Sequence, residues 1–192
     1  MNKNVYGVTR LFHPADVGVN AGFIITSNSI IHIDAGTTVA DGNHLLAKSS
    51  EMAKEKRQIF LVLTHHHSDH VFGMRVFKEA GAKVIAHENV RKFLSHRRLP
   101  LFRTMLETYK PFIVKLMVER FHYTEKKAEE TLGDVKLFLP DEVFTEDTTL
   151  QIDKDELHLL YTPGHVPSEA AVYHPKSRIL FAGDTIYELS LI

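Results

Sequence analysis

Residues 64–70 read Thr-His-His-His-Ser-Asp-His and directly follow the unbroken apolar run 59–63. A short apolar run without a helical period is typical of a strand that is buried on both faces. The stretch then supplies imidazoles at His65 and His67, a carboxylate at Asp69 and a further imidazole at His70. The end of a buried strand is held rigidly yet opens to solvent on one side, as a catalytic metal with an exchangeable ligand position requires. The stretch therefore predicts a metal site.

The available side chains narrow the kind of metal. The sequence has 13 histidines and no cysteine, so imidazoles and carboxylates are its strong metal ligands. Such a nitrogen and oxygen set suits zinc, iron or manganese. A polar loop or a purification tag is the alternative, but a tag would be terminal and uninterrupted, whereas this run contains Ser68 and Asp69. His66 points away at the alternate position, and we expect it to face solvent or lie beside the ligands.

The flanking sequence alternates between strand and helix patterns. Opening antiparallel strands are expected at 5–12, 21–26 and 30–34. A helix over about 42–54 follows, with Asp41 as its N-cap. Beyond the histidines, a short helix from Val71 to Ala80 ends at Gly81, and a strand over 83–86 comes next. Strand, site loop, helix and strand make an α/β unit.

Residues from about 88 to 133 are helical in pattern, and Pro100 and Pro111 are expected to break them into pieces. Thr124 is the expected N-cap of the last piece and Gly133 its end. Strand patterning returns afterwards, with hairpin turns expected around 153–155 and 175–177. We predict a single domain over 1–192 with a helical insertion, or cap, at 88–133.

Two later segments each place one further ligand at the end of an expected strand. Residues 161–165 read Tyr-Thr-Pro-Gly-His, and residues 180–184 read Leu-Phe-Ala-Gly-Asp. Either is weak alone, because a His after a Gly turn, or a Gly-Asp at a strand end, is usually turn chemistry. In this order after the histidine run, His165 and Asp184 become strong candidates for the same metal site.

These three segments together resemble the metallo-β-lactamase superfamily. The resemblance covers almost the whole chain, since Ile-His-Ile-Asp-Ala-Gly at 31–36 is similar to the family's early strand and Asp-Gly turn. It implies an α/β fold of the metallo-β-lactamase αββα type, in which two mixed β-sheets lie between helices.

The resemblance also implies a ligand set. His65, His67 and His165 would hold the first metal, Asp69 and His70 the second, and Asp184 would bridge both. Asp69 is the expected catalytic residue, and no residue is assigned to an organic cofactor. Two Zn²⁺ ions are expected, with iron or manganese left open. The resemblance places Asp34 near the metals, but an Asp before Ala-Gly is also a turn former, and we expect a structural role.

One element of the family pattern is missing. The family usually supplies a last histidine to the second metal some tens of residues after the bridging Asp, whereas this sequence ends at Ile192, eight residues past Asp184. A fragment of a longer protein, a second chain that completes the site, and a second metal with fewer ligands all stay open. We expect a fragment whose C-terminal strands and helix are truncated, because the remaining sheet would otherwise leave an apolar edge unpaired.

A two-metal site favours hydrolysis. Coordination lowers the pKa of bound water towards about 7, so a zinc-bound hydroxide is a nucleophile at neutral pH. Asp69 would ligate and orient it, while the metals polarise the substrate and stabilise the leaving group. We predict a hydrolase that cleaves an ester, thioester, amide or phosphoester of a small molecule.

Other readings stay open. Similar relatives hold a single iron by two histidines and an aspartate and oxidise persulfides, and the identity of the metal separates this reading from the hydrolase. A truncated, non-catalytic metal-binding domain is a further alternative. A nuclease of the transfer-RNA-processing kind shares the ligand run, but this sequence shows no basic arm with interleaved aromatics, so the nuclease is disfavoured. The flavodiiron branch has Glu where this chain has His67, and the β-lactamases with a cysteine ligand are excluded because the chain has no cysteine.

Composition points to no macromolecular partner. The chain has 23 Lys plus Arg against 24 Asp plus Glu, which favours neither a nucleic acid nor an anionic membrane. Its apolar runs fall far short of the ~20 residues that span a bilayer, and residues 1–10 do not resemble a secretory signal. We expect a cytoplasmic protein with a small-molecule substrate, and a homodimer stays open.

Overall fold

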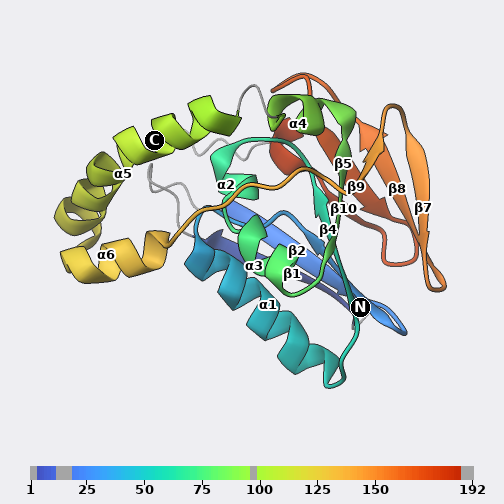
Figure 1. Ribbon diagram of the computed structural model, residues 1–192. Helices are drawn as coiled ribbons and strands as arrows, with labels where there is room; N and C mark the ends of the chain where they lie inside the picture. Colours follow the sequence, from blue (N-terminus) through green and yellow to red (C-terminus); the bar gives the residue numbers. More distant parts are fainter. Residues whose placement is uncertain (1–3, 12–18, 96–98, 187–192) are drawn as a thin grey trace.

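The computed structural model describes residues 4–11, 19–95 and 99–186, in which two β-sheets pack face to face (Figure 1). The first sheet has the strand order β1-β2-β3-β4-β5-β6, with antiparallel neighbours up to β3 and parallel neighbours from β3 to β6. Its strands are Val5–Leu11, Val19–Ile25, Ser29–Ile33, Gln58–Leu63, Lys83–His87 and Glu142–Phe144. The second sheet is antiparallel, in the order β10-β9-β8-β7. Its strands in chain order are Thr148–Ile152, Asp155–Tyr161, Ala170–His174 and Ile179–Phe181.

Helices cover the outer face of the first sheet. In Figure 1, α1 and α3 lie against this sheet, while α5 and α6 extend to the left of the sandwich. The helices are α1 Val39–Ala53, α2 Ser68–Val71, α3 Met74–Glu79, α4 Glu88–Phe93, α5 Leu99–Phe121 and α6 Glu125–Leu132. A 3₁₀ turn, η1, spans Gly183–Thr185. The helices α4, α5 and α6 fall within 88–133, the segment expected to be helical. That this segment is an insertion or cap stays a prediction.

Two hydrophobic layers hold the sandwich together. Phe23, Leu61 and Phe77 belong to the layer between the helices and the first sheet. Ile24 and Val62, the next residues along β2 and β4, belong to the layer between the two sheets. Successive side chains of a strand point to opposite faces, so β4 is apolar without alternation because both of its faces are buried. Its carboxyl end is therefore firmly held.

The N-cap of α1 lies three residues before Asp41, the residue expected from the sequence, so that prediction was wrong. Thr38 caps the helix, and its Oγ1 accepts a hydrogen bond from the backbone N–H of Asp41 at 3.0 Å. The Asp41 carboxylate in turn accepts the backbone N–H of Thr38 at 2.9 Å. Asp41 thus closes a capping box from the third helical position. Thr38 and Asp41 both have side chains typical of an N-cap, so the sequence alone does not show which of the two is the cap.

Two expected helix breaks differ from the structure. Pro111 lies inside α5 and does not end it. The side chain of Pro111 is exposed, so water can replace the hydrogen bond that its missing N–H would have given to Glu107. The single helix expected over 71–80 is instead two short ones, α2 and α3, with Gly73 between them. A Cβ on Gly73 would lie 2.0 Å from the carbonyl oxygen of Ala35, so glycine is required at this close approach.

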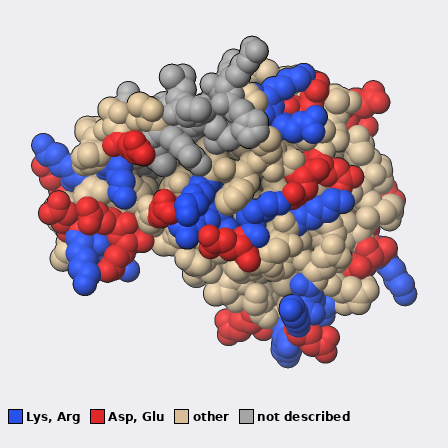
Figure 2. Space-filling model, viewed as in Figure 1, with Lys and Arg blue, Asp and Glu red and all other residues tan. Residues whose placement is uncertain are grey.

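The surface carries charges of both signs. Figure 2 shows Lys and Arg side chains next to Asp and Glu over the face viewed. Arg75 on α3, for example, lies 2.7 Å from Glu79 and 2.9 Å from Asp134. Among the described residues, no helix is both long and apolar enough to cross a membrane.

Candidate metal centre

The topology brings four chain segments to one edge of the sandwich. Because β3 and β4 are parallel, Asp34 after β3 and the histidine run after β4 lie at the same edge. His165 follows the end of β8, and Asp184 follows β10. The backbone N–H of Ala170 donates to the carbonyl oxygen of Thr64 at 2.9 Å and so ties the second sheet to the end of β4. Residues more than a hundred positions apart in sequence thereby meet.

A first group consists of His65, His67, His165 and Asp184, whose ligand atoms all lie within 4.8 Å of one another. His165 Nε2 is 2.9 Å from His67 Nδ1 and 3.5 Å from Asp184 Oδ2. His65 Nε2 is 3.8 Å from the same carboxylate oxygen. The ring of His65 stands edge to face against those of His67 and His165, at interplanar angles of 75° and 89°. Three imidazoles and one carboxylate oxygen can hold one divalent ion.

A second group consists of Asp69, His70 and Asp184. His70 Nε2 lies 3.2 Å from Asp184 Oδ1 and 3.5 Å from Asp69 Oδ2. Asp184 therefore turns one oxygen to each group, Oδ2 towards His65 and His165 and Oδ1 towards His70. This arrangement fits a carboxylate that bridges two metal ions.

Two buried ring nitrogens show that the residues fit metal ions. His65 and His70 are 0% and 2% exposed, and the Nε2 atom of each has no hydrogen-bond partner among the described residues. An unpaired buried polar atom costs about 1–3 kcal/mol. A metal ion at each nitrogen would satisfy it, and a nitrogen and oxygen donor set suits zinc, iron or manganese. Which residues bind metal stays a prediction.

The electrostatic environment keeps the first group ready to bind metal. Burial and the neighbouring His70 hold the pKa of His65 well below its usual value. Burial and His165 also lower the pKa of His67. Both rings are therefore neutral at neutral pH, the form in which imidazole binds metal. Burial opposes protonation of His70, but the nearby carboxylates of Asp34 and Asp184 raise its pKa well above the usual value.

Asp34 combines the two roles that the sequence left open. It adopts a left-handed backbone conformation, with φ 64°, at the turn after β3. Its Oδ1 accepts the backbone N–H of Thr64 at 2.8 Å, and its Oδ2 accepts the Thr64 hydroxyl at 2.8 Å. Oδ2 also lies 2.8 Å from His70 Nδ1. Asp34 therefore fixes the turn and orients the ring of His70.

A family model described as the metallo-beta-lactamase superfamily matches residues 14–192. The chain belongs to this superfamily. Its fold is accordingly the metallo-β-lactamase αββα sandwich of the α/β class, as the sequence resemblance implied.

Individual members of the superfamily are distant relatives. The chain is 25% identical over 183 residues to the probable metallo-hydrolase YqjP of Bacillus subtilis, and the match covers 92% of this chain and 56% of that protein. It is 25% identical over 130 residues to the hydroxyacylglutathione hydrolase GloC of Haemophilus influenzae, which covers 67% and 50%. The chain thus spans about half the length of these relatives.

Among solved structures, a metallo-beta-lactamase from Pontibacter korlensis superposes with a TM-score of 0.63 at 21% identity, covering 99% of this chain and 72% of that one. The superfamily protein TTHA1429 of Thermus thermophilus superposes with a TM-score of 0.62 at 22% identity, covering 96% and 60%. At these identities the likeness concerns the fold.

One acidic residue next to the candidate ligands, Glu169, lies outside the motifs by which the sequence resembles metallo-β-lactamases. Glu169 is fully buried beside His65, with Oε2 3.4 Å from His65 Nδ1, and burial raises the pKa of its carboxyl to about 7. The available signal was an acidic residue four positions after His165, directly before the apolar strand β9. Such a position is unusual for a carboxylate, because charged side chains are seldom fully buried without a partner.

Five of the described histidines outside the two groups have other contacts. His66 stacks on Phe93 with ring centroids 3.7 Å apart, and its Nδ1 lies 2.7 Å from Ser168 Oγ, so it points away from the candidate ligands. His32 packs in the core against Phe77. The remaining strand histidines, His87, His158 and His174, contact Tyr161, Glu156 and Asp155 respectively.

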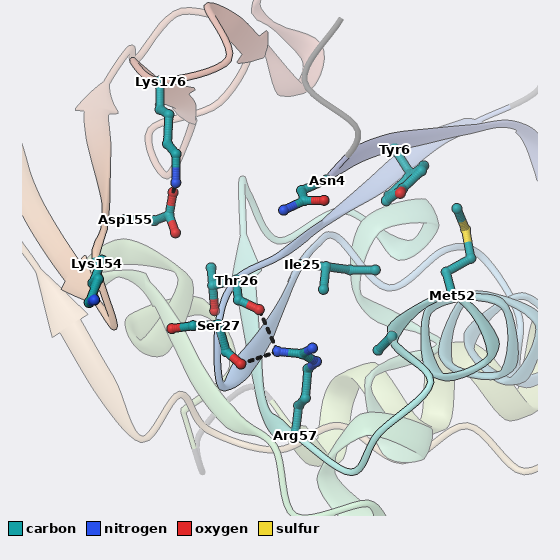
Figure 3. A pocket seen from close by; sticks show the side chains of 11 residues that line it. Asn4, Tyr6, Ile25, Thr26, Ser27, Met52, Arg57, Lys154, Asp155 and Lys176 are labelled. Atoms are coloured by element: carbon teal, nitrogen blue, oxygen red, sulfur yellow. Dashed lines mark hydrogen bonds and ion pairs between the residues drawn. The ribbon is translucent and has the colours of Figure 1, made fainter.

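Two hollows of about 420 Å³ lie outside the ligand groups. One is at the opposite end of β3 and β4, where Arg57 donates hydrogen bonds to the carbonyl oxygens of Thr26 and Ser27 (Figure 3). The other is lined by His66, Phe93 and residues 166–168, which directly follow His165. The second hollow therefore adjoins the two loops that carry the candidate ligands.

Proposed function

We propose that the chain is the metal-binding core of a hydrolase that uses two divalent ions, zinc in the first instance, to cleave an ester, thioester, amide or phosphoester of a small molecule. The observation that carries this proposal is Asp184, whose two oxygens face two separate ligand groups. A single-metal enzyme has no need for a carboxylate shared in this way.

The names of the curated relatives support the reaction class. They include a probable metallo-hydrolase, a type 2 metallo-beta-lactamase of Elizabethkingia meningoseptica and a hydroxyacylglutathione hydrolase. All three names describe hydrolases, but they do not agree on a substrate. They therefore support hydrolysis as the class of reaction and identify no substrate for this chain. Fold-level likeness carries the argument no further.

Each side chain has a distinct task in this proposal. A bound metal pair supplies Lewis-acid polarisation of a carbonyl or phosphoryl oxygen and lowers the pKa of a water molecule. Asp69 is the proposed catalytic residue, since its carboxylate is partly exposed and lies in the second group. There it can orient a water molecule and accept a proton from it. His65 and His67 donate nitrogen lone pairs, and Asp184 fixes the spacing between the two groups.

The hollow beside the centre is a candidate substrate pocket. Its walls are mostly apolar, from the ring of Phe93, Val166 and Pro167, with Lys92 also lining it. An apolar wall with few polar groups suits the non-reacting part of a small molecule. We propose that this part of the substrate binds here while the scissile bond lies over the ligand groups.

Hydrolysis by zinc-loaded protein tests the proposal. We expect turnover of generic aryl esters or thioesters that disappears with a chelator, returns with zinc and is lost in His67→Ala. A protein that binds about one iron and consumes oxygen with a persulfide would contradict the hydrolase and favour the dioxygenase. A metal-loaded, folded protein without turnover of esters, thioesters, amides, phosphoesters or persulfides would favour the non-catalytic domain. A cytoplasmic location and a homodimer stay predictions.

A further inference from the structure

We propose that Glu169 is a positioning residue that holds the His65 ring in the tautomer whose Nε2 can bind metal. The proposal rests on the proposed function only in taking His65 Nε2 as a ligand atom. Glu169 itself touches neither metal nor substrate in this account, and it acts through His65 and through the backbone of Asp184.

The carboxylate of Glu169 joins the two segments that supply the first group. Oε1 accepts the backbone N–H of Asp184 at 3.1 Å. Oε2 lies 3.4 Å from His65 Nδ1 and has no hydrogen-bond partner among the described residues. The Glu169 side chain is 0% exposed, so no solvent competes for Oε2. A buried carboxylate oxygen with a single nearby donor site is well suited to accept a hydrogen bond from the Nδ1–H of His65.

The neighbours of His65 decide where its single ring proton lies. A neutral imidazole carries one N–H, and the nitrogen that binds metal must be the other one. Two oxygens lie near Nδ1, Thr64 Oγ1 at 3.1 Å and Glu169 Oε2 at 3.4 Å. The Thr64 hydroxyl already donates its proton to Asp34, so towards His65 it can only accept. Both oxygens can accept a hydrogen bond from Nδ1–H, so they favour a proton on Nδ1 and leave the Nε2 lone pair free. In its ionised form Glu169 is the stronger acceptor of the two.

Gly183 makes room for this carboxylate. The residue adopts φ +55°, and a Cβ there would lie 2.3 Å from Glu169 Oε1 and 2.9 Å from Thr64 Cβ. Any other side chain would push the Glu169 carboxylate or the Asp184 backbone away. This close approach lets the Glu169 carboxylate reach the backbone N–H of Asp184. Glu169 therefore also helps to fix the position of the Asp184 backbone, from which the shared Asp184 carboxylate extends.

The two buried histidines of the centre are supported by different acids. Asp34 lies at Nδ1 of His70, and Glu169 lies at Nδ1 of His65. A carboxylate behind a metal-binding histidine fixes its tautomer and raises its basicity, and removing it typically lowers metal affinity 10–100-fold. The separate acids predict that each histidine can be disturbed without the other.

Glu169→Gln is the decisive variant, because the amide keeps an oxygen for Asp184 N–H but turns an NH₂ donor towards His65 Nδ1. We expect zinc affinity, measured by competition with a chromophoric chelator, to fall by about 10–100-fold. In chelator-treated protein, nitrogen NMR should find His65 protonated on Nδ1 in the natural sequence and increasingly on Nε2 in the variant. Asp155→Asn is the matched control, since Asp155 is a buried acid 3.2 Å from His174 Nε2. It should change neither readout.

The two readouts separate this proposal from the proposed function. A folded Glu169→Gln protein with zinc affinity within twofold of the natural protein would overturn it, as would a loss of affinity with an unchanged His65 tautomer. If the variant does not fold, the natural protein still decides, because a proton on His65 Nε2 would contradict the assignment. Absence of zinc binding by the natural protein would refute the hydrolase, whereas the His65 tautomer would still test Glu169.

Discussion

Asp34 Oδ2 lies 2.8 Å from Nδ1 of His70, although the two residues are 36 positions apart. The same oxygen accepts the Thr64 hydroxyl, so one buried carboxylate connects the turn after β3, the end of β4 and the second ligand group. The candidate metal centre is therefore supported by a side chain that lies outside both proposed ligand groups.

Asp34→Asn should weaken the second metal more than the first. Asparagine tolerates the left-handed backbone at this position, so the turn is kept while the negative charge behind His70 is lost. We expect about a 10–100-fold loss in the affinity of one of two sites in a stepwise zinc titration. Glu169→Gln serves as the comparison, because it should affect the other site. Equal losses at both sites in both variants would contradict separate support of the two histidines.

His32 should make the fold sensitive to acid. Burial lowers its pKa from 6.5 to about 3, so below 6.5 the unfolded chain takes up a proton that the folded protein does not. Stability is therefore full above pH 6.5 and declines as the pH falls towards 3. This residue alone should cost about 2 kcal/mol of unfolding free energy between about pH 6.5 and pH 5.

Urea unfolding of chelator-treated protein at the two pH values checks the role of His32. His32→Gln, which cannot titrate, should lose less stability on acidification than the natural protein, whatever its starting stability. His44→Gln is the control, because His44 is exposed on α1 and should leave the pH dependence as it is. An unchanged pH dependence in His32→Gln would show that other groups dominate.

Gly73→Ala should destabilise the site loops. The new Cβ would lie 2.0 Å from the Ala35 carbonyl oxygen and 3.0 Å from that of Thr38, where neither backbone can easily move. Forced overpacking of this kind costs about 1–3 kcal/mol or more. Gly7→Ala is the matched control, since a Cβ at Gly7 has nothing within 4 Å. Chemical denaturation would contradict the account if both substitutions cost the same.

Substitution of the neighbouring residues His66 and His67 should have different effects on metal binding. His66→Ala is expected to keep its metal, because the His66 ring stacks on Phe93 and lies by Ser168. It should instead raise the KM of any substrate that uses the adjoining hollow, with a smaller effect on kcat. His67→Ala should lose metal. Elemental analysis of both variants checks this contrast, and metal loss of similar size in both would refute the assignment of His66.

The sequence could predict the fold and the candidate ligands because the informative residues come in short local patterns. The histidine run after a buried strand, the Thr-Pro-Gly-His segment and the Gly-Asp segment are each visible in a few residues. Strand pairing then brings their side chains together, so that Asp184 lies beside His65 and His70. Their binding of metal stays a prediction.

What escaped prediction depends on contacts between segments. Glu169 has no motif of its own, and its importance comes from the distance to His65, which only the packing of β9 against the end of β4 creates. The cap of α1 was misassigned because Thr38 and Asp41 form one box, in which either residue alone has the composition of a cap. Pro111 was expected to break a helix, but its exposure decides whether the lost hydrogen bond matters.

The central claim is a two-metal centre bridged by Asp184, and metal content per chain tests it most directly. Protein purified without added metal should contain nearly two zinc ions per chain by elemental mass spectrometry, and Asp184→Ala should contain fewer than one. About one iron per chain would contradict the two-zinc hydrolase, and two zinc ions retained in Asp184→Ala would contradict the bridging role.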